Sequence, residues 1–246
     1  MLEVQNLSVN FDSVRAVKNV SFLLQNKEAL GILGESGSGK STLALAILDL
    51  VKIASGRVLL DGRDFLPSDR GAKISMIFQD PFTSLNPVFT IGEQIMETVR
   101  LHQNLSGNRA KDRAIELLKL VHIHDPEDKI NNYPHQFSGG MKQRVMIAIA
   151  LACNPEILIA DEPTTALDTT IQKEILDLIS ELKEKLGFSV IFITHNFGII
   201  RKMCSRVLVM QKGEIVEEAL VADIFSSPKH PYTKELVDNL KVLNAA

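Results

Sequence analysis

The sequence predicts an α/β fold, and three features of the chain support this prediction. Apolar and polar residues alternate between residues 2 and 22, as in half-buried antiparallel strands. The apolar run Ala29–Leu33 leads into a glycine-rich loop, and a second apolar run at residues 43–50 has the character of a helix. Residues 91–145 have helical spacing and polar loops. We therefore expect a core with a mixed sheet, an N-terminal antiparallel β subdomain and an inserted α-helical subdomain.

Composition narrows the class of protein. The 246 residues are 45% hydrophobic, which is enough to bury a sizeable core. The formal net charge is −3 and there is no long basic block, so the sequence has no charge pattern typical of nucleic-acid binding. Cys153 and Cys204 lack metal-type spacing and are expected to be buried thiols of a reducing compartment. His122 and His124 lack a third ligand and are expected in a solvated loop. With no signal peptide and no apolar run of membrane-spanning length, we expect a cytoplasmic protein.

The glycine-rich loop carries the first chemical signal. Residues 34–41 fit the pattern G-x-x-x-x-G-K-[ST] between a strand and a helix, which is the context of a phosphate-binding loop. Glycines let backbone N–H groups face phosphates, and the following helix N-terminus favours the same anion. Lys40 is expected to reach the β- and γ-phosphates, and the Ser41 hydroxyl to hold Mg²⁺. The predicted nucleotide-binding residues are Gly34, Glu35, Ser36, Gly37, Ser38, Gly39, Lys40, Ser41 and Thr42.

Two further residues are candidates for contacts with a nucleotide. Phe11 lies in the predicted turn between the N-terminal strands, where it either packs in the core or stacks on adenine. Strands are predicted at residues 57–62 and 73–78, and Gln79 ends the second, before a proline-containing loop. Its amide can contact a metal or a water, or it can simply cap the loop.

A second helix start has the features of an anion site. Ser138, Gly139 and Gly140 precede a predicted amphipathic helix whose apolar stripe is Met141, Val145, Ile149 and Ala152. This start is either a plain N-cap or a second anion-binding helix N-terminus.

Acidic residues follow a short apolar strand predicted at residues 157–160. Asp161 is placed to hold water on Mg²⁺, and Glu162 to orient or deprotonate the attacking water, a pair that suits hydrolysis. Another strand, at residues 188–193, ends near His195, which either contacts the γ-phosphate or the water or is a capped core histidine. Between them we expect a helix, stopped by Gly187, whose apolar face is Ile171, Ile175, Leu178, Leu182 and Leu186.

In this order and spacing, the motifs resemble the ATP-binding cassette ATPases along essentially the whole chain. The resemblance implies one nucleotide-binding domain over residues 1–246, with a core and β subdomain at 1–90 and 146–246 and a helical subdomain at 91–145. It also implies that Phe11 stacks on adenine, that Asp168 belongs to the ATP site, and that Gln79 and His195 join Lys40 and Glu162 in catalysis. Two cassettes would pair head to tail, each ATP lying between one phosphate loop and the partner's Ser-Gly-Gly helix. The implied metal ligands are Ser41, Gln79 and Asp161.

A narrower resemblance is to the peptide and nickel uptake branch, carried by residues 79–87, 133–144, 159–168 and 230–233. It implies a peripheral ATPase subunit on the cytoplasmic face of the membrane that works with permease subunits, a second ATPase chain, identical or related, and indirectly an extracytoplasmic substrate-binding protein. The chain stops at Ala246 without the cysteine-bearing tail of many peptide importers, which favours nickel or a metal chelate over small peptides. The alternatives are a peptide-specific importer with a shortened tail and a multi-chain exporter.

Overall fold

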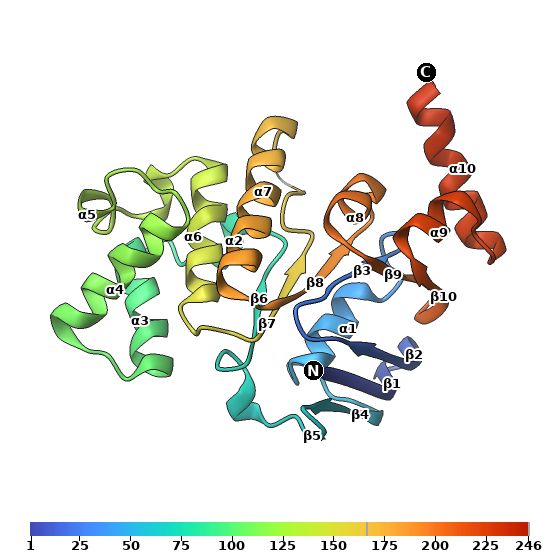
Figure 1. Cartoon of the computed structure of the whole chain (residues 1–246). Coiled ribbons are helices and arrows are strands. Elements are labelled where there is room, and N and C mark those ends of the chain that lie inside the picture. The colour runs from blue at the N-terminus through green and yellow to red at the C-terminus, as the bar shows by residue number, and fades with distance from the viewer. Residues whose placement is uncertain (166, 246) are drawn as a thin grey trace. The chain divides into compact units, whose positions relative to one another are not determined.

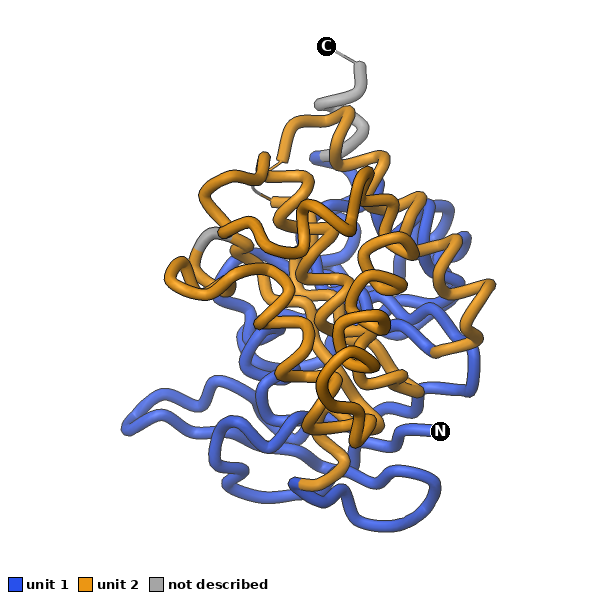
Figure 2. The backbone as a smooth tube through the Cα atoms, turned by 90° about the vertical axis from the view of Figure 1, so that its left-hand side faces the viewer, with its two compact units in different colours: residues 1–67, 189–246 blue, residues 68–188 orange. Residues whose placement is uncertain are grey.

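The computed structural model describes residues 1–165 and 167–245, with side chains described except at residues 82 and 240–245. The chain divides into two compact units (Figure 2). Unit 1 comprises residues 1–67 and 189–246, and unit 2 comprises residues 68–188.

The N-terminal half of unit 1 is an antiparallel sheet (Figure 1). Its strands have the order β2-β1-β4-β5, and β1 pairs antiparallel with both β2 and β4. Leu2, Val4 and Val9 are buried, so the alternation seen in the sequence marks one apolar face of the sheet. This confirms the predicted antiparallel pair, which runs further than expected. The strands are β1 (Leu2–Phe11), β2 (Val14–Leu24), β4 (Ser55–Leu60) and β5 (Arg63–Asp64).

The second sheet of unit 1 contains the strand that precedes the phosphate loop. β3 (Ala29–Leu33) pairs parallel with β8 (Ser189–Thr194) and with β9 (Arg206–Gln211), and β10 (Glu214–Leu220) is antiparallel to β9. Leu30, Ile32 and Leu33 are fully buried, which explains why β3 has an unbroken apolar run rather than an alternating one. The helices of this unit are α1 (Lys40–Ile47), α8 (Phe197–Met203), α9 (Val221–Ser226) and α10 (Pro231–Ala245).

Unit 2 combines a parallel strand pair with helices. β6 (Ile74–Ile77) and β7 (Ile157–Asp161) pair in parallel, and α6 packs on β6 and against α3, α4 and α7. The helical spacing predicted for residues 91–145 is found in α3 to α6. The helices are α2 (Pro81–Ser84), α3 (Ile91–Gln103), α4 (Gly107–Leu120), α5 (Pro126–Lys129), α6 (Gly139–Leu151) and α7 (Thr169–Leu186), with 3-10 turns at Pro67–Asp69 and Pro134–Gln136.

Two predicted apolar faces need correction. On α7, Ile175, Leu178 and Leu182 are buried, but Leu186 is 49% exposed because the helix ends there, at Gly187 with φ +77°. On α6, Val145 is buried, whereas Met141 and Ile149 are only half-buried.

The cysteines are half-buried rather than buried thiols, which corrects the expectation from the sequence. Burial raises the pKa of Cys153 to about 11, and burial together with the Glu28 charge raises the pKa of Cys204, so neither thiol is activated. Within residues 1–165 and 167–245, no group of three or more His, Cys, Asp or Glu side chains has the arrangement of a metal site. The described helices are all too short or too polar to cross a membrane.

Candidate functional site

The loop between β3 and α1 has a backbone that only glycine permits at two positions. Gly39 adopts φ +103°, and a Cβ atom there would lie 2.4 Å from the carbonyl oxygen of Ala16. A Cβ atom at Gly34 would lie 2.3 Å from the carbonyl oxygen of Met210. The loop is therefore pressed against two neighbouring backbone segments of unit 1, which fixes its path from the strand into the helix.

The same loop presents donors suited to an anion. Lys40 is 5% exposed, and its Nζ donates to the carbonyl oxygens of Gly34 and Glu35, each at 2.8 Å. The Ser38 hydroxyl is buried and has no hydrogen-bond partner among the described residues. At the start of α1, Gly39 provides no side-chain cap and the first turn carries no acidic residue. A polyanion would satisfy these donors, so the predicted phosphate loop fits a nucleotide phosphate chain.

His195 lies beside the phosphate loop in unit 1. It follows the end of β8, and the phosphate loop follows Leu33 at the end of β3, which is the parallel neighbour of β8. Together with Gly34 and Glu35 it lines a small cavity of about 30 Å³. The imidazole is exposed, so the structure favours a ligand contact over a core role for this residue.

Phe11 lies at the end of β1, opposite Val14, rather than in the turn. Its side chain is 48% exposed. It therefore does not belong to the core, which leaves its ring face open for stacking.

In unit 2, Asp161 and Glu162 are buried at the end of β7, being 4% and 9% exposed. Glu162 Oε2 accepts hydrogen bonds from the Thr165 hydroxyl at 2.7 Å and from Gln79 Nε2 at 3.3 Å. Gln79 is thus brought to Glu162 by the parallel pairing of β6 with β7, as expected for two strand ends at one edge. Thr165 was not predicted, although its place three residues after Glu162 was a usable signal.

Glu162 has an unusual backbone. Its φ of +45° lies in the left-handed region, which costs a residue other than glycine about 1 to 3 kcal/mol. Such strain persists where the surroundings define one conformation, and it is frequent at functional sites. The observation supports a specialised role for this carboxylate.

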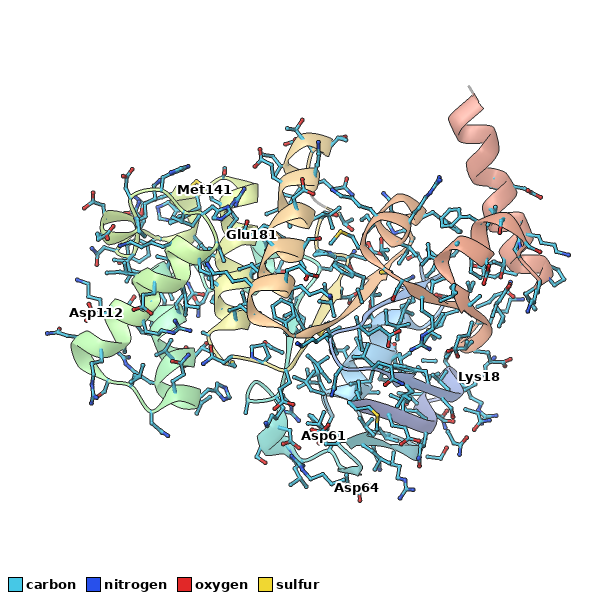
Figure 3. All side chains as sticks on the ribbon, viewed as in Figure 1. Lys18, Asp61, Asp64, Asp112, Met141 and Glu181 are labelled. Atoms are coloured by element: carbon cyan, nitrogen blue, oxygen red, sulfur yellow. The ribbon has the colours of Figure 1, made fainter. Side chains whose placement is uncertain are left out.

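The Ser-Gly-Gly segment begins α6 as predicted. The Ser138 hydroxyl accepts the N–H of Met141 at 3.4 Å, and Figure 3 shows Met141 in the first turn of this helix. No acidic residue occupies the first turn, and Gly139 and Gly140 are half-buried. A Cβ atom at Gly140 would lie 2.6 Å from Ile171 Cγ2, so a glycine is needed for α6 to approach α7.

Asp168 caps α7. Its carboxylate accepts the backbone N–H groups of Thr170 and Ile171 at 3.1 and 3.0 Å. The contact gives this residue a structural role in addition to its predicted place in the ATP site.

The candidate metal ligands have the right chemistry for Mg²⁺. Ser41 offers a hydroxyl, Gln79 an amide oxygen and Asp161 a carboxylate, and hard oxygen donors of this kind are what Mg²⁺ takes, usually with substrate phosphates and water. Gln79 Nε2 faces Glu162, which leaves its amide oxygen as the atom for a metal.

Comparison with known proteins identifies close relatives. The ABC transporter family profile matches residues 17–165. A probable peptide ABC transporter ATP-binding protein of Sinorhizobium fredii, y4tR, is 51% identical over 98% of this chain and 76% of its own length. The oligopeptide transport ATP-binding protein OppD of Bacillus subtilis is 47% identical over 100% of this chain and 73% of its own length.

A solved structure shares the fold. The ATP-binding cassette MJ0796, in a dimeric post-hydrolysis state bound to ADP and Pi, aligns with a TM-score of 0.79 and 32% identity. The alignment covers 90% of this chain and 99% of that one. The α/β prediction, with a phosphate loop between strand and helix, is therefore confirmed.

Proposed function

Because this chain belongs to the ABC transporter family and is an ATPase of that family, we propose that it is the ATP-hydrolysing subunit that drives import of small peptides. The observation that carries the hydrolytic part is the carboxylate of Glu162, buried at a strand end and held by Thr165 and Gln79. The peptide part rests on similarity over nearly the whole chain to proteins named for peptide transport.

The residues of unit 1 bind the nucleotide in this proposal. Phe11 stacks on adenine, the N–H groups of the phosphate loop receive the phosphates, and Lys40 exchanges its carbonyl partners for β- and γ-phosphate oxygens. His195, which shares a cavity with Gly34 and Glu35, contacts the γ-phosphate or the attacking water. These contacts thus stabilise largely the charges that develop during phosphoryl transfer.

The residues of unit 2 prepare the water. Glu162 orients it and accepts its proton, and Thr165 and Gln79 fix the direction in which the carboxylate points. Gln79 and Asp161 would each offer an oxygen to Mg²⁺, as would Ser41 of unit 1, and the metal would neutralise charge on the phosphate oxygens.

Hydrolysis is converted to work by pairing two ATPase chains. In this proposal ATP joins one chain's phosphate loop to the Ser138 to Gly140 segment and to Asp168 of a second chain, either identical or related. The donors at the start of α6 support this, since no acidic side chain occupies its first turn. Cleavage of ATP removes the bridging γ-phosphate, and the pair opens.

A surface for the membrane partner is available in unit 2. Phe78, Val88 and Phe89 are 42%, 71% and 50% exposed around the loop that follows Gln79. An exposed apolar group of this kind is typical of an interaction site, and we propose that permease subunits dock there. In this proposal the chain lies on the cytoplasmic face of the membrane, and an extracytoplasmic substrate-binding protein acts through the permease.

Uptake by cells separates the candidate substrates. Cells carrying the intact chain, Lys40→Ala or the exposed control Lys52→Ala are supplied with a labelled dipeptide or with labelled nickel. We expect Lys40→Ala alone to abolish dipeptide uptake, because it removes the charge that holds the phosphates. Loss of nickel uptake alone would instead assign a nickel or metal-chelate importer, and unchanged uptake of both would favour a different substrate or an exporter.

A further inference from the structure

The segment His230 to Thr233, at the start of α10, has no part in the hydrolysis described above. It is fixed in unit 1 by Glu217 of β10, which is 8% exposed. The Glu217 carboxylate accepts the backbone N–H groups of Lys229 at 2.8 Å and His230 at 2.9 Å. Pro231 then begins the helix, where its missing N–H costs nothing.

This anchoring directs Tyr232 to the phosphate loop. Its ring is 7% exposed and packs in an apolar cluster with Leu33 and Phe197. Its hydroxyl accepts the backbone N–H of Glu35 at 3.3 Å and also interacts with the Glu35 carboxylate. One turn along α10, Leu236 lines the small cavity that Glu35 shares with His195.

The hydroxyl stays protonated at neutral pH. Burial raises the pKa of Tyr232, the hydrogen bond from the Glu35 N–H opposes this, and the Glu35 carboxylate raises it again, so the net shift is upward. A protonated hydroxyl can accept from the N–H and donate to the carboxylate at once. The hydroxyl oxygen therefore holds the Glu35 backbone, and its hydrogen remains available to the Glu35 carboxylate.

Glu35 needs such a restraint because it is the acidic residue within the phosphate loop. A carboxylate that turned toward the phosphates would repel them, and a loop free to shift at residue 35 would misplace the N–H groups that follow. We propose that Tyr232 is a positioning residue for ATP binding, which keeps the Glu35 carboxylate away from the phosphates and the loop in its binding conformation. This inference rests on the proposed ATP site.

The test separates the hydroxyl from the ring. Tyr232→Phe keeps the buried ring, and Tyr133→Phe is the matched control because Tyr133 is the other of the two tyrosines and is 41% exposed. The full-length proteins are titrated with a fluorescent N-methylanthraniloyl ATP, and KM and kcat for ATP are measured. We expect Tyr232→Phe to raise the dissociation constant and KM about 3- to 10-fold, the effect of losing one hydrogen bond, with kcat changed less than about 2-fold. Tyr133→Phe should match the wild type.

A double substitution distinguishes positioning from a general loss of stability. If the hydroxyl also restrains the Glu35 carboxylate, Tyr232→Phe should cost less affinity in a Glu35→Gln background than in the wild type, because only the backbone hydrogen bond is then lost. An unchanged affinity in Tyr232→Phe overturns the inference, and an equal loss with and without Glu35→Gln overturns its carboxylate part and assigns the effect to the backbone contact alone. Failure of the proposed function would look different, since the wild type would then bind the ATP analogue no better than Lys40→Ala, and both proposals would fall.

Discussion

Replacement of Thr165 by valine tests whether the Glu162 carboxylate must be held in place for hydrolysis. The substitution is nearly isosteric and removes the hydroxyl that donates to Glu162 Oε2 at 2.7 Å. Gln79 Nε2 also donates to that oxygen, at 3.3 Å, and so makes the weaker bond. The carboxylate should lose most of its orientation without losing its charge.

The size of the effect follows from the kind of bond. A hydrogen bond to a charged group contributes about 1.5 to 3 kcal/mol. Each 1.36 kcal/mol of barrier is worth a factor of ten in rate, so kcat should fall about 10- to 100-fold. KM for ATP should change little, because in the proposed mechanism Glu162 contacts the attacking water rather than the bound nucleotide.

Steady-state ATP hydrolysis by the purified chain measures both constants. Glu162→Gln sets the lower limit, since it keeps the shape of the side chain and removes the base. Thr98→Val is the matched control, because within the described part of the chain the Thr98 hydroxyl donates to a carbonyl of its own helix, that of Gln94, at 3.4 Å. Thr165→Ser should recover most of the activity. A Thr165→Val protein that hydrolyses ATP at the wild-type kcat would refute the positioning argument.

Two further predictions concern the framework of each unit. Gly140→Ala should lower the free energy of urea unfolding by about 1 to 3 kcal/mol, because its Cβ would meet Ile171 Cγ2 at 2.6 Å. Ile171→Ala should relieve part of that loss in the double variant. Purely additive effects of the two substitutions would contradict this prediction. For Glu217, burial raises the pKa, but the nearby Thr233 side chain and the hydrogen bonds from the N–H groups of Lys229 and His230 outweigh it, leaving a lowered pKa. Its stabilising effect should therefore be complete above the ordinary carboxyl pKa and be lost as the pH falls through the lowered one. Urea unfolding of wild type and Glu217→Gln should accordingly differ at pH 7 and converge in acid.

Local patterns were enough to predict the strand and loop that form the phosphate site. The bounds of β3 follow from an apolar run between a polar turn and a glycine-rich loop, and Gly187 ends α7 in the left-handed conformation that the sequence indicated. Leu186 was wrongly predicted to belong to the buried face, because a periodic pattern does not reveal where a helix extends beyond the core. Phe11 could not be assigned from sequence because one aromatic fits a core or a surface equally well.

Local patterns could not predict contacts between residues that are distant in the sequence. Tyr232 and Glu35 are 197 residues apart, and their contact depends on the pairing of β3 with β9 and β9 with β10 and on the anchoring by Glu217. The motif at residues 230–233 could be quoted from the sequence, but no local rule connected it with a loop near the other end of the chain. Thr165 differs, because its contact with Glu162 spans three residues and could have been proposed.

In each unit a neutral hydroxyl holds an acidic residue, and the two acidic residues have opposite requirements. In unit 1, the Tyr232 hydroxyl holds Glu35, an acid that has to stay clear of bound phosphates. In unit 2, the Thr165 hydroxyl holds Glu162, an acid that has to face the attacking water from a backbone with φ of +45°. A neutral hydroxyl suits both tasks because it fixes a carboxylate without cancelling its charge, which a lysine or arginine partner would do. Substituting either hydroxyl should therefore alter where an acid points, and the separation of effects, on affinity for Tyr232 and on kcat for Thr165, follows from the step that each acid serves.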